Sequence, residues 1–266
     1  LKSLTINIII KIISKIIKKR IFSYHTFHCE LKRYSKYKLI LIYLSKFIIG
    51  EFSCVSNNLK INWECFLKKK VNFLPIGISN MDRDKILRKS KDINKNIKSS
   101  NIKNNVIKIT WIGRFEKVKN PLLFLKSLRK LDTESNYKFE IIFAGEGKLV
   151  PIFKKELKKF LNLKLPNIDV QYMGMIEREE VINLISTTNI YVNTSNSESF
   201  CVCANEFLYN PFCKIILPEI KNLKEIYECK RVDFYKVNDE KSLSNSILKN
   251  AEYFFKKSSY SYENIY

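Results

Sequence analysis

The sequence is poor in residues that usually mark a nucleotide or metal site: its 266 residues include 6 glycines and 2 histidines. Gly145-Glu146-Gly147 lacks the third glycine of a dinucleotide-binding fingerprint, and no Gly-Lys-Ser/Thr sequence marks a P-loop. The 7 cysteines contain no Cys-x-x-Cys pair, and Cys201 and Cys203 have no matching second pair. We therefore expect no metal and no cofactor, and the scattered cysteines favour a reducing cytosol.

Acidic residues are also scarce, since 48 Lys and Arg residues oppose 26 Asp and Glu residues, giving a formal net charge of +22. Such a surplus favours anionic partners: a nucleic acid, a phosphorylated small molecule or an anionic membrane surface. The abundance of Ile, Lys, Asn, Phe and Tyr also fits the imprint of an AT-rich genome, which raises the lysine content whatever the function. No RNP, helix-turn-helix or zinc pattern is present, so we expect no nucleic acid partner.

Long apolar runs are missing as well. The stretch Leu4–Ile17 is apolar, but two lysines interrupt it and it is too short to span a bilayer. Lys18-Lys19-Arg20 follows this stretch instead of preceding it, so we expect no signal peptide and predict a cytoplasmic protein. The chain begins with Leu1, and we expect it to be a fragment or a processed product.

What is present is a regular alternation of helix and strand patterns, in two series. Residues 1–81 form the first series, and Lys, Asn, Ser and Asp then dominate residues 82–105, which predicts a flexible linker. Residues 106–255 form the second series, followed by a tail at 256–266. The alternation predicts a parallel, doubly wound α/β sheet, in which ligands bind at the carboxyl ends of the strands. The strands of the second series are predicted at 106–111, 139–144, 168–172, 190–193, 214–217 and 232–235.

A cluster of positive charge follows the first strand of the second series. Gly113-Arg114 closes that strand, and Lys119 lies five residues further on, where Asn120-Pro121 predicts the start of a helix. Arginine offers a fork of donors to phosphate oxygens, lysine offers a mobile point charge, and a helix N-terminus offers free N–H groups. Together they predict a pyrophosphate clamp, although both residues also fit ordinary surface cations.

Two further strand ends carry candidate ligand-binding residues. Gly145-Glu146-Gly147 follows an apolar strand, where glycine permits either close approach to a ligand or a plain turn. Glu198-Ser199-Phe200-Cys201 follows the strand at Ile190–Val192, and Glu206 lies eight residues after Glu198 on an expected helix. Eight residues span about 2.2 helical turns, so we expect both carboxylates on roughly one face. There they can accept hydrogen bonds from sugar hydroxyls, although acidic loops are often merely solvated.

These features, in this order, resemble the donor-binding domain of glycosyltransferase family 4, the glycosyl transferases group 1. The resemblance covers about 106–240 and includes Gly113-Arg114, Lys119, Phe-Ala-Gly-Glu-Gly at 143–147, Gly174, Ser195 and the Glu198/Glu206 pair. Tyr24-His25-Thr26-Phe27-His28 resembles the family's N-terminal strand whose histidine faces the donor sugar. The resemblance implies a GT-B fold: a Rossmann-like donor domain preceded by a partial, N-terminally truncated Rossmann-like domain.

The resemblance also implies an activity. A retaining hexosyltransferase of this kind moves a sugar from a nucleotide-sugar donor to a lipid-linked or polysaccharide acceptor, as in the synthesis of bacterial O-antigen, lipopolysaccharide or capsule. The implied catalytic residues are Glu198, Arg114 and Lys119. The implied donor-binding residues are His28, Gly113, Gly145, Glu146, Ser199, Phe200, Cys201 and Glu206.

The chain departs from the family pattern at several positions. Cys201 stands where the family usually has glycine, and we expect its side chain to crowd the donor. Lys221-Asn222 replaces a Gly-Gly pair, and the N-terminal domain is about half its usual length. A non-catalytic or truncated remnant that at most binds nucleotide is therefore the alternative. Basic helices expected at Leu4–Lys19 and Val150–Leu161 also predict peripheral contact with an anionic inner membrane surface.

Overall fold

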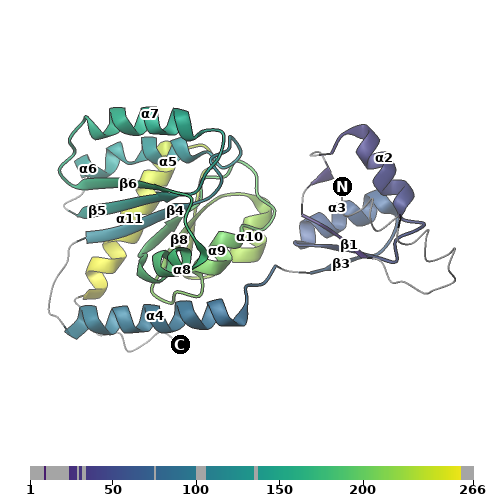
Figure 1. Cartoon of the computed structure of the whole chain (residues 1–266), viewed down its shortest axis with the longest axis horizontal. Coiled ribbons are helices and arrows are strands. Elements are labelled where there is room, and N and C mark those ends of the chain that lie inside the picture. Colours follow the sequence, from purple (N-terminus) through teal and green to yellow (C-terminus); the bar gives the residue numbers. More distant parts are fainter. Residues whose placement is uncertain are drawn as a thin grey trace. The chain divides into compact units, whose positions relative to one another are not determined.

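The computed structural model describes residues 9, 24–28, 30–31, 34–74, 76–99, 106–134 and 137–258. The chain divides into two compact units, residues 1–77 and 78–266. Each unit contains a sheet of parallel strands whose connections are helical (Figure 1), which confirms the predicted α/β fold.

The first unit has a three-stranded parallel sheet in the order β1-β2-β3. Its elements are β1 (Tyr24–Phe27), α2 (Lys36–Ser45), β2 (Glu51–Cys54), α3 (Asn57–Leu67) and β3 (Val71–Phe73). The core is aromatic, because the Phe27 ring stacks on Trp63 with ring centroids 3.7 Å apart and on Phe52 at 5.6 Å. Ser56 caps α3, since its hydroxyl accepts a hydrogen bond from the Leu59 amide.

One face of α2 is apolar and yet exposed. Its large side chains are Tyr37, Ile40, Leu41 and Leu44, and Phe47 in the turn after the helix is exposed as well. Their exposed fractions range from 51% to 82%, so most of the surface of this stripe is exposed in the described part of the chain. Contiguous exposed apolar surface of this kind is typical of a contact with a partner or a membrane.

The second unit has a six-stranded parallel sheet in the order β6-β5-β4-β7-β8-β9. The strands are β4 (Val106–Ile112), β5 (Lys138–Ala144), β6 (Ile168–Gly174), β7 (Ile190–Val192), β8 (Lys214–Pro218) and β9 (Val232–Tyr235). The chain adds strands outward from β4 on one side and then returns to begin the other side at β7. The carboxyl ends of β4 and β7 therefore flank the point where the strand order reverses, which is where ligands bind in doubly wound sheets.

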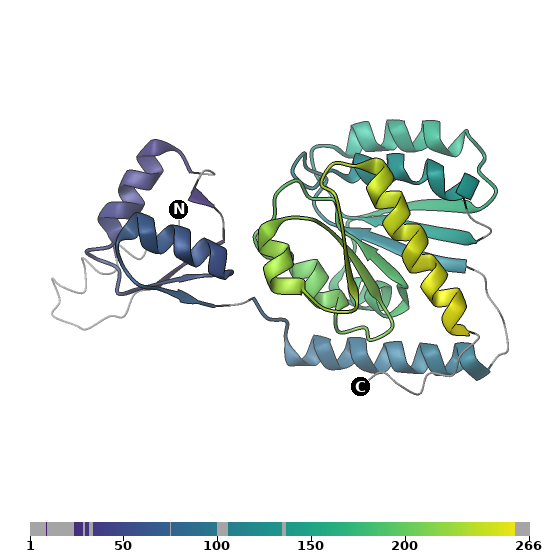
Figure 2. The same ribbon diagram turned by 180° about the vertical axis from the view of Figure 1, so that it is seen from behind.

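Two layers of helices cover this sheet (Figures 1 and 2). The first layer contains α5 (Pro121–Ser127), α6 (Arg129–Glu134), α7 (Val150–Leu161) and α11 (Glu240–Ser258), the yellow helix that crosses the sheet in Figure 2. The second contains α4 (Asn80–Ser99), α8 (Arg178–Thr187), α9 (Val202–Phe207) and α10 (Lys221–Tyr227). Residues on both faces of the inner strands β4, β5, β7 and β8 are mostly buried, as expected for a parallel sheet between two helix layers, whereas the edge strand β6 alternates buried and exposed residues.

The predicted flexible linker at 82–105 is wrong for its first eighteen residues, which belong to α4. The segment is polar overall, but Ile86 is fully buried in the core that α8, α9 and α10 share. Lys85 and Lys89 both bind Glu179 of α8, at 3.1 and 2.7 Å. A narrow contact stripe with ion pairs at its edges is therefore enough to fix a helix whose composition suggests a linker.

Most other predicted elements are confirmed within a few residues. The helix predicted to start at Asn120-Pro121 is α5, which begins at Pro121, and a second helix, α6, follows it after Leu128. The helix predicted at Leu4–Lys19 lies outside the described residues, apart from Ile9, and so does the tail beyond Ser258. None of the helices formed by the described residues combines the length and apolar character needed to cross a bilayer.

Candidate active site

The loops after β4, β5 and β6 are joined to one another by backbone hydrogen bonds. The Gly113 amide donates to the Ala144 carbonyl at 3.1 Å, and the Gly145 amide donates to Gly174 at 2.6 Å. A Cβ atom at residue 145 would lie 2.1 Å from the Gly113 carbonyl oxygen, and the φ of Gly145 is +125°. Glycine is therefore needed here for close packing between two loops, which explains this residue without a ligand.

Glu146 lies beside Tyr172 at these strand ends. The Tyr172 hydroxyl is 3.1 Å from Glu146 Oε1 and 3.0 Å from the Gly145 carbonyl oxygen. Burial and the neighbouring Glu146 raise the pKa of Tyr172 to about 12. Because this phenol stays protonated at neutral pH, it donates hydrogen bonds that fix the loop and orient Glu146.

The loops after β4 and β7 meet at an ion pair between Lys119 and Glu198. Glu198 Oε2 accepts from Lys119 and, at 3.0 Å, from the Ser195 hydroxyl. The pair is mostly enclosed, with 21% of the Lys119 side chain and 15% of Glu198 exposed. Burial alone would lower the pKa of Lys119, but the facing Glu198 carboxylate more than offsets burial and raises it. Lys119 is therefore a charged ammonium that already has a carboxylate partner.

Trp111 and Thr194 hold these two loops together, and the sequence analysis did not identify either. The Trp111 indole N–H donates to the Thr194 hydroxyl at 2.9 Å, and that hydroxyl donates to the Lys119 carbonyl at 2.8 Å. The Asn196 amide also donates to the Val118 carbonyl at 2.8 Å. A signal was present in the sequence, because a tryptophan in a buried strand needs a partner for its N–H group.

The segment from Glu198 to Cys201 is anchored from α10. Asn222 Nδ2 donates to the Glu198 carbonyl at 3.1 Å, and the Tyr227 hydroxyl lies 2.7 and 2.8 Å from the carbonyls of Phe200 and Cys201. The Phe200 side chain is buried. The amides of Ser199 and Phe200 have no hydrogen-bond partner among the described residues. The carbonyls of this segment are thus hydrogen-bonded to side chains of α10, while the backbone amides of Ser199 and Phe200 can donate to a ligand.

The thiol of Cys201 is turned into the core of the second unit, which argues against the expected crowding of a donor by this side chain. Its Sγ lies 3.1 Å from Asn193 Nδ2 and 3.7 Å from the Tyr191 hydroxyl, and the residue is 3% exposed. Burial raises the pKa of this thiol to about 11, so it is neutral at physiological pH. The φ of +58° is in the left-handed region that glycine prefers, so a glycine-like backbone is kept with the side chain turned inward.

Glu206 lies on α9, whereas Glu198 lies in the loop before this helix, so the expectation that the two carboxylates share one helical face is wrong. Glu206 has its own cation. Arg178 Nη1, on α8, donates to Glu206 Oε1 at 2.7 Å, and 12% of the Glu206 side chain is exposed. Burial raises the pKa of Glu206, and the Arg178 charge opposes that rise. Sequence reasoning missed Arg178, because nothing in its local pattern connects it with a residue 28 positions away.

The two acids therefore share one arrangement. Each has one carboxylate oxygen bound to a cation, Lys119 for Glu198 and Arg178 for Glu206. The other oxygen, Oε1 of Glu198 and Oε2 of Glu206, accepts no hydrogen bond within the described part of the chain. A carboxylate that is fixed at one oxygen and open at the other is suited to accept hydrogen bonds from ligand hydroxyls.

Two other predicted residues stand apart from these contacts. Arg114 is exposed at the end of β4, and its guanidinium makes no hydrogen bond or ion pair with any described residue. His28 is exposed and belongs to the first unit, so its predicted contact with a donor sugar stays a prediction. No group of three or more His, Cys, Asp or Glu side chains among the described residues could hold a metal ion.

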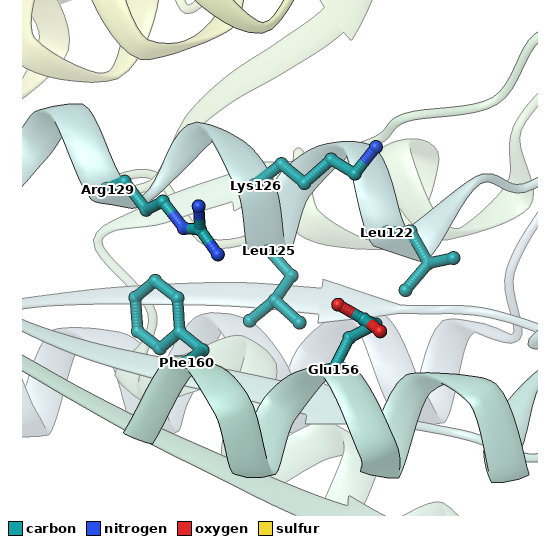
Figure 3. Close-up of a pocket in the computed structure, with 6 residues that line it drawn as sticks. All are labelled: Leu122, Leu125, Lys126, Arg129, Glu156 and Phe160. Carbon is teal, nitrogen blue, oxygen red and sulfur yellow. The ribbon is translucent and has the colours of Figure 1, made fainter. Parts of the chain in front are cut away.

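A small depression lies elsewhere, between α5, α6 and α7 (Figure 3). It is lined by Leu122, Leu125, Lys126, Arg129, Glu156 and Phe160. Glu156 is bound to Lys159 at 2.7 Å, and the floor is apolar. This depression lies between helices that cover the sheet, not at the strand ends, and contains none of the predicted site residues.

Comparison with known proteins agrees with this architecture. The sequence model of the family described as "Glycosyl transferases group 1" matches residues 92–252, more than half of the chain. An α-1,4-N-acetyl-D-galactosaminyltransferase of Campylobacter jejuni, which acts on a diNAcBac-PP-undecaprenol-linked glycan, is 32% identical over 109 residues. That match covers 40% of this chain and 28% of the relative. The tRNA-queuosine α-mannosyltransferase of Drosophila melanogaster is 29% identical over 130 residues, which cover 46% of this chain and 32% of that protein. The matches thus span about a third or less of either relative.

Solved structures show the same fold. HepE of Anabaena, in complex with UDP and glucose, superposes with a TM-score of 0.71 at 16% identity, over 95% of this chain and 67% of its own. A glycosyltransferase of Rickettsia africae superposes with a TM-score of 0.65 at 18% identity, over 97% of this chain and 71% of its own. At these identities the likeness establishes the fold.

Proposed function

Since the chain belongs to the glycosyl transferases group 1 family and has the GT-B type of α/β fold, we propose that it transfers a sugar from a nucleotide-sugar donor. The observation that carries the proposal is a pair of acids that each bind a cation through one carboxylate oxygen and leave the other oxygen open. Glu198 binds Lys119 where the loops after β4 and β7 meet, and Glu206 on α9 binds Arg178. The solved complex of HepE with UDP and glucose supports a donor of this class.

In this proposal, Arg114 and Lys119 neutralise the diphosphate that leaves with the nucleotide. The guanidinium of Arg114 forms no ion pair with any described residue, whereas the Lys119 ammonium is already paired with the Glu198 carboxylate. Charge that develops on the leaving oxygen is stabilised by cations already in place, which lowers the barrier to transfer. The open amides of Ser199 and Phe200 add neutral donors for phosphate or sugar oxygens. No cofactor has a part in this proposal.

Glu198 and Glu206 then orient the two ends of the donor. Glu198 accepts from sugar hydroxyls through its open oxygen, and Glu206 accepts from the ribose. We propose that transfer retains the configuration of the sugar and that His28 contacts the sugar from the first unit. Proton NMR of the first-formed product would show an α-linked sugar from an α-linked donor, and a β-linked product would contradict retention.

The proposed acceptor is a lipid-linked or polysaccharide glycan of a bacterial cell surface, such as O-antigen, lipopolysaccharide or capsule. The Campylobacter jejuni relative, whose name includes an undecaprenol-linked substrate, supports this choice. The exposed face of α7 contains Lys155, Lys158 and Lys159 beside exposed Ile152, and we propose peripheral contact there with an anionic inner membrane surface. Equal binding to neutral and anionic vesicles would contradict this contact.

A donor hydrolysis and transfer assay tests the proposed function. UDP-, GDP- and ADP-linked hexoses and N-acetylhexosamines are incubated with the protein, with and without short undecaprenyl diphosphate-linked acceptors, and released nucleotide is measured. We expect turnover of one donor, which Arg114→Ala abolishes while the circular dichroism spectrum is unchanged. A chain that binds a nucleoside diphosphate but turns over no donor would favour the alternative, a non-catalytic or truncated remnant of a glycosyltransferase.

A further inference from the structure

Arg178 lies between carboxylates that come from two other helices. Its Nη1 donates to Glu206 Oε1 of α9 at 2.7 Å. Its Nε and Nη2 both donate to Asp82 Oδ2 of α4, at 3.1 and 2.9 Å. Asp82 thus holds one edge of the guanidinium plane, and the far nitrogen is directed at Glu206.

The three groups differ in their exposure in a way that suggests separate tasks. Exposed fractions are 44% for the Arg178 side chain, 24% for Asp82 and 12% for Glu206. Both Asp82 contacts use a single oxygen, so this acid serves as an anchor for the arginine. Glu206 is the most enclosed of the three, but its Oε2 accepts no hydrogen bond within the described part of the chain. It is therefore the group that can accept a hydrogen bond from a ligand.

We propose that Arg178, anchored by Asp82, is a positioning residue that fixes Glu206 for its contact with the ribose hydroxyls of the nucleotide. This inference rests on the proposed function, which assigns the ribose to Glu206. A glutamate side chain loses several rotamers when it binds a ligand, and an arginine that holds one oxygen removes most of that cost beforehand. The Arg178 charge also favours the ionised form of the enclosed Glu206 carboxylate, which accepts hydrogen bonds from both ribose hydroxyls.

The position of Asp82 gives this arrangement a second consequence. The first compact unit ends at Gly77, and α4 begins at Asn80, so the residues that follow the boundary supply the anchor. Asp82 is fixed in that helix because its amide donates to the Ser79 hydroxyl at 3.1 Å. The first turn of α4, at the start of the second unit, therefore belongs to the proposed donor site.

Binding of nucleotides with and without ribose hydroxyls tests the inference. Isothermal titration calorimetry would compare UDP, GDP and ADP with their 2′,3′-dideoxy counterparts. We expect the nucleotide that the native chain prefers to bind at least about tenfold more tightly than its dideoxy form. In Arg178→Met and Asp82→Asn this ratio is expected to fall to about threefold or less, with the dideoxy affinity unchanged within about twofold. Arg178→Lys, which keeps one donor for Glu206, is expected to give an intermediate ratio.

Lys89→Met is the matched control. Lys89 joins α4 to α8, as the contact between Asp82 and Arg178 does. It donates to Glu179 at 2.7 Å and to Asn183 at 2.6 Å, but it does not contact Glu206. This variant is expected to keep the native ratio, and a fall equal to that of Arg178→Met would overturn the inference in favour of helix packing. An unchanged ratio in Arg178→Met, or an equal loss of ribo and dideoxy binding, would overturn it too. Failure of the native chain to bind any nucleoside diphosphate would overturn the proposed function, and this inference with it.

Discussion

Replacement of Glu198 by glutamine would test the ion pair at the centre of the site. Glu198→Gln keeps the size of the side chain and an acceptor oxygen for Ser195, but it removes the charge that faces Lys119. Loss of one member of a buried ion pair costs about 3–5 kcal/mol, whereas a fully exposed pair contributes about 0–1 kcal/mol. The partial exposure of this pair places the expected loss at about 2 kcal/mol, since the glutamine oxygen still accepts from Lys119.

The same substitution is expected to have the opposite effect on anion binding. In Glu198→Gln the charge of Lys119 is no longer neutralised by a carboxylate, and the carboxylate of Glu198 no longer repels an incoming diphosphate. At the effective dielectric constant of a partly exposed site, this change is worth about 1 kcal/mol, or about fivefold in Kd. Sugar transfer is expected to fall at the same time, because the carboxylate that orients the sugar is gone.

Urea denaturation and calorimetry with UDP, GDP and ADP would measure both effects on the same samples. The reasoning predicts lower stability together with tighter nucleoside diphosphate binding. Ser195→Ala is the matched control, because it removes a hydrogen bond to Glu198 and leaves the ion pair in place. Weaker diphosphate binding in Glu198→Gln, or a loss of stability below about 0.5 kcal/mol, would refute the argument that the Glu198 carboxylate stabilises the fold through Lys119 and competes with a diphosphate for this lysine.

Three other substitutions have separable expected outcomes. Glu206→Gln is expected to gain stability relative to the native chain as the pH rises from 4.5 to 8, because burial raises the pKa of Glu206 and ionisation of this acid therefore destabilises only the native chain. Any such advantage should disappear below pH 4.5, where the acid is protonated in both folded and unfolded chains, and urea midpoints from pH 4 to 8 would show it. Trp111→Phe removes the indole donor to Thr194, and we expect a loss of about 1–2 kcal/mol in thermal denaturation and a higher donor KM. Ile86→Ala is expected to cost about 2–4 kcal/mol in urea denaturation, because the side chain is fully buried. A loss near zero would mean that α4 does not pack as described.

The sequence was a good guide wherever a feature is local. Most strands of the second unit are largely apolar segments of the right length; Gly113 directly follows β4, and Lys119 and Glu198 lie further along the loops after β4 and β7. The spacing of Glu198 and Glu206 is also local, although only Glu206 lies within a helix and each acid has a different cation. Strand ends in a doubly wound sheet converge whatever the loop sequences are, so a site could be expected there.

The sequence was a poor guide wherever a role depends on a distant partner. The polar composition of α4 suggested a linker, and only the burial of Ile86 in the core and the contacts of Lys85 and Lys89 with α8 show why it is a helix. The guanidinium of Arg178 is held by hydrogen bonds to Asp82, which lies 96 residues away in the chain. The inward turn of Cys201 depends on Asn193 and Tyr191, and no pattern around residue 201 reveals it.

Calorimetric comparison of nucleoside diphosphates with their monophosphates tests the central claim most directly. We predict that the native chain prefers the diphosphate at least about tenfold, and that Arg114→Met combined with Lys119→Met removes this preference while monophosphate binding persists. Lys117→Met, an exposed lysine in the same loop, should leave the preference intact. A double variant that still distinguishes diphosphate from monophosphate as the native chain does would contradict the claim that these two cations bind the diphosphate.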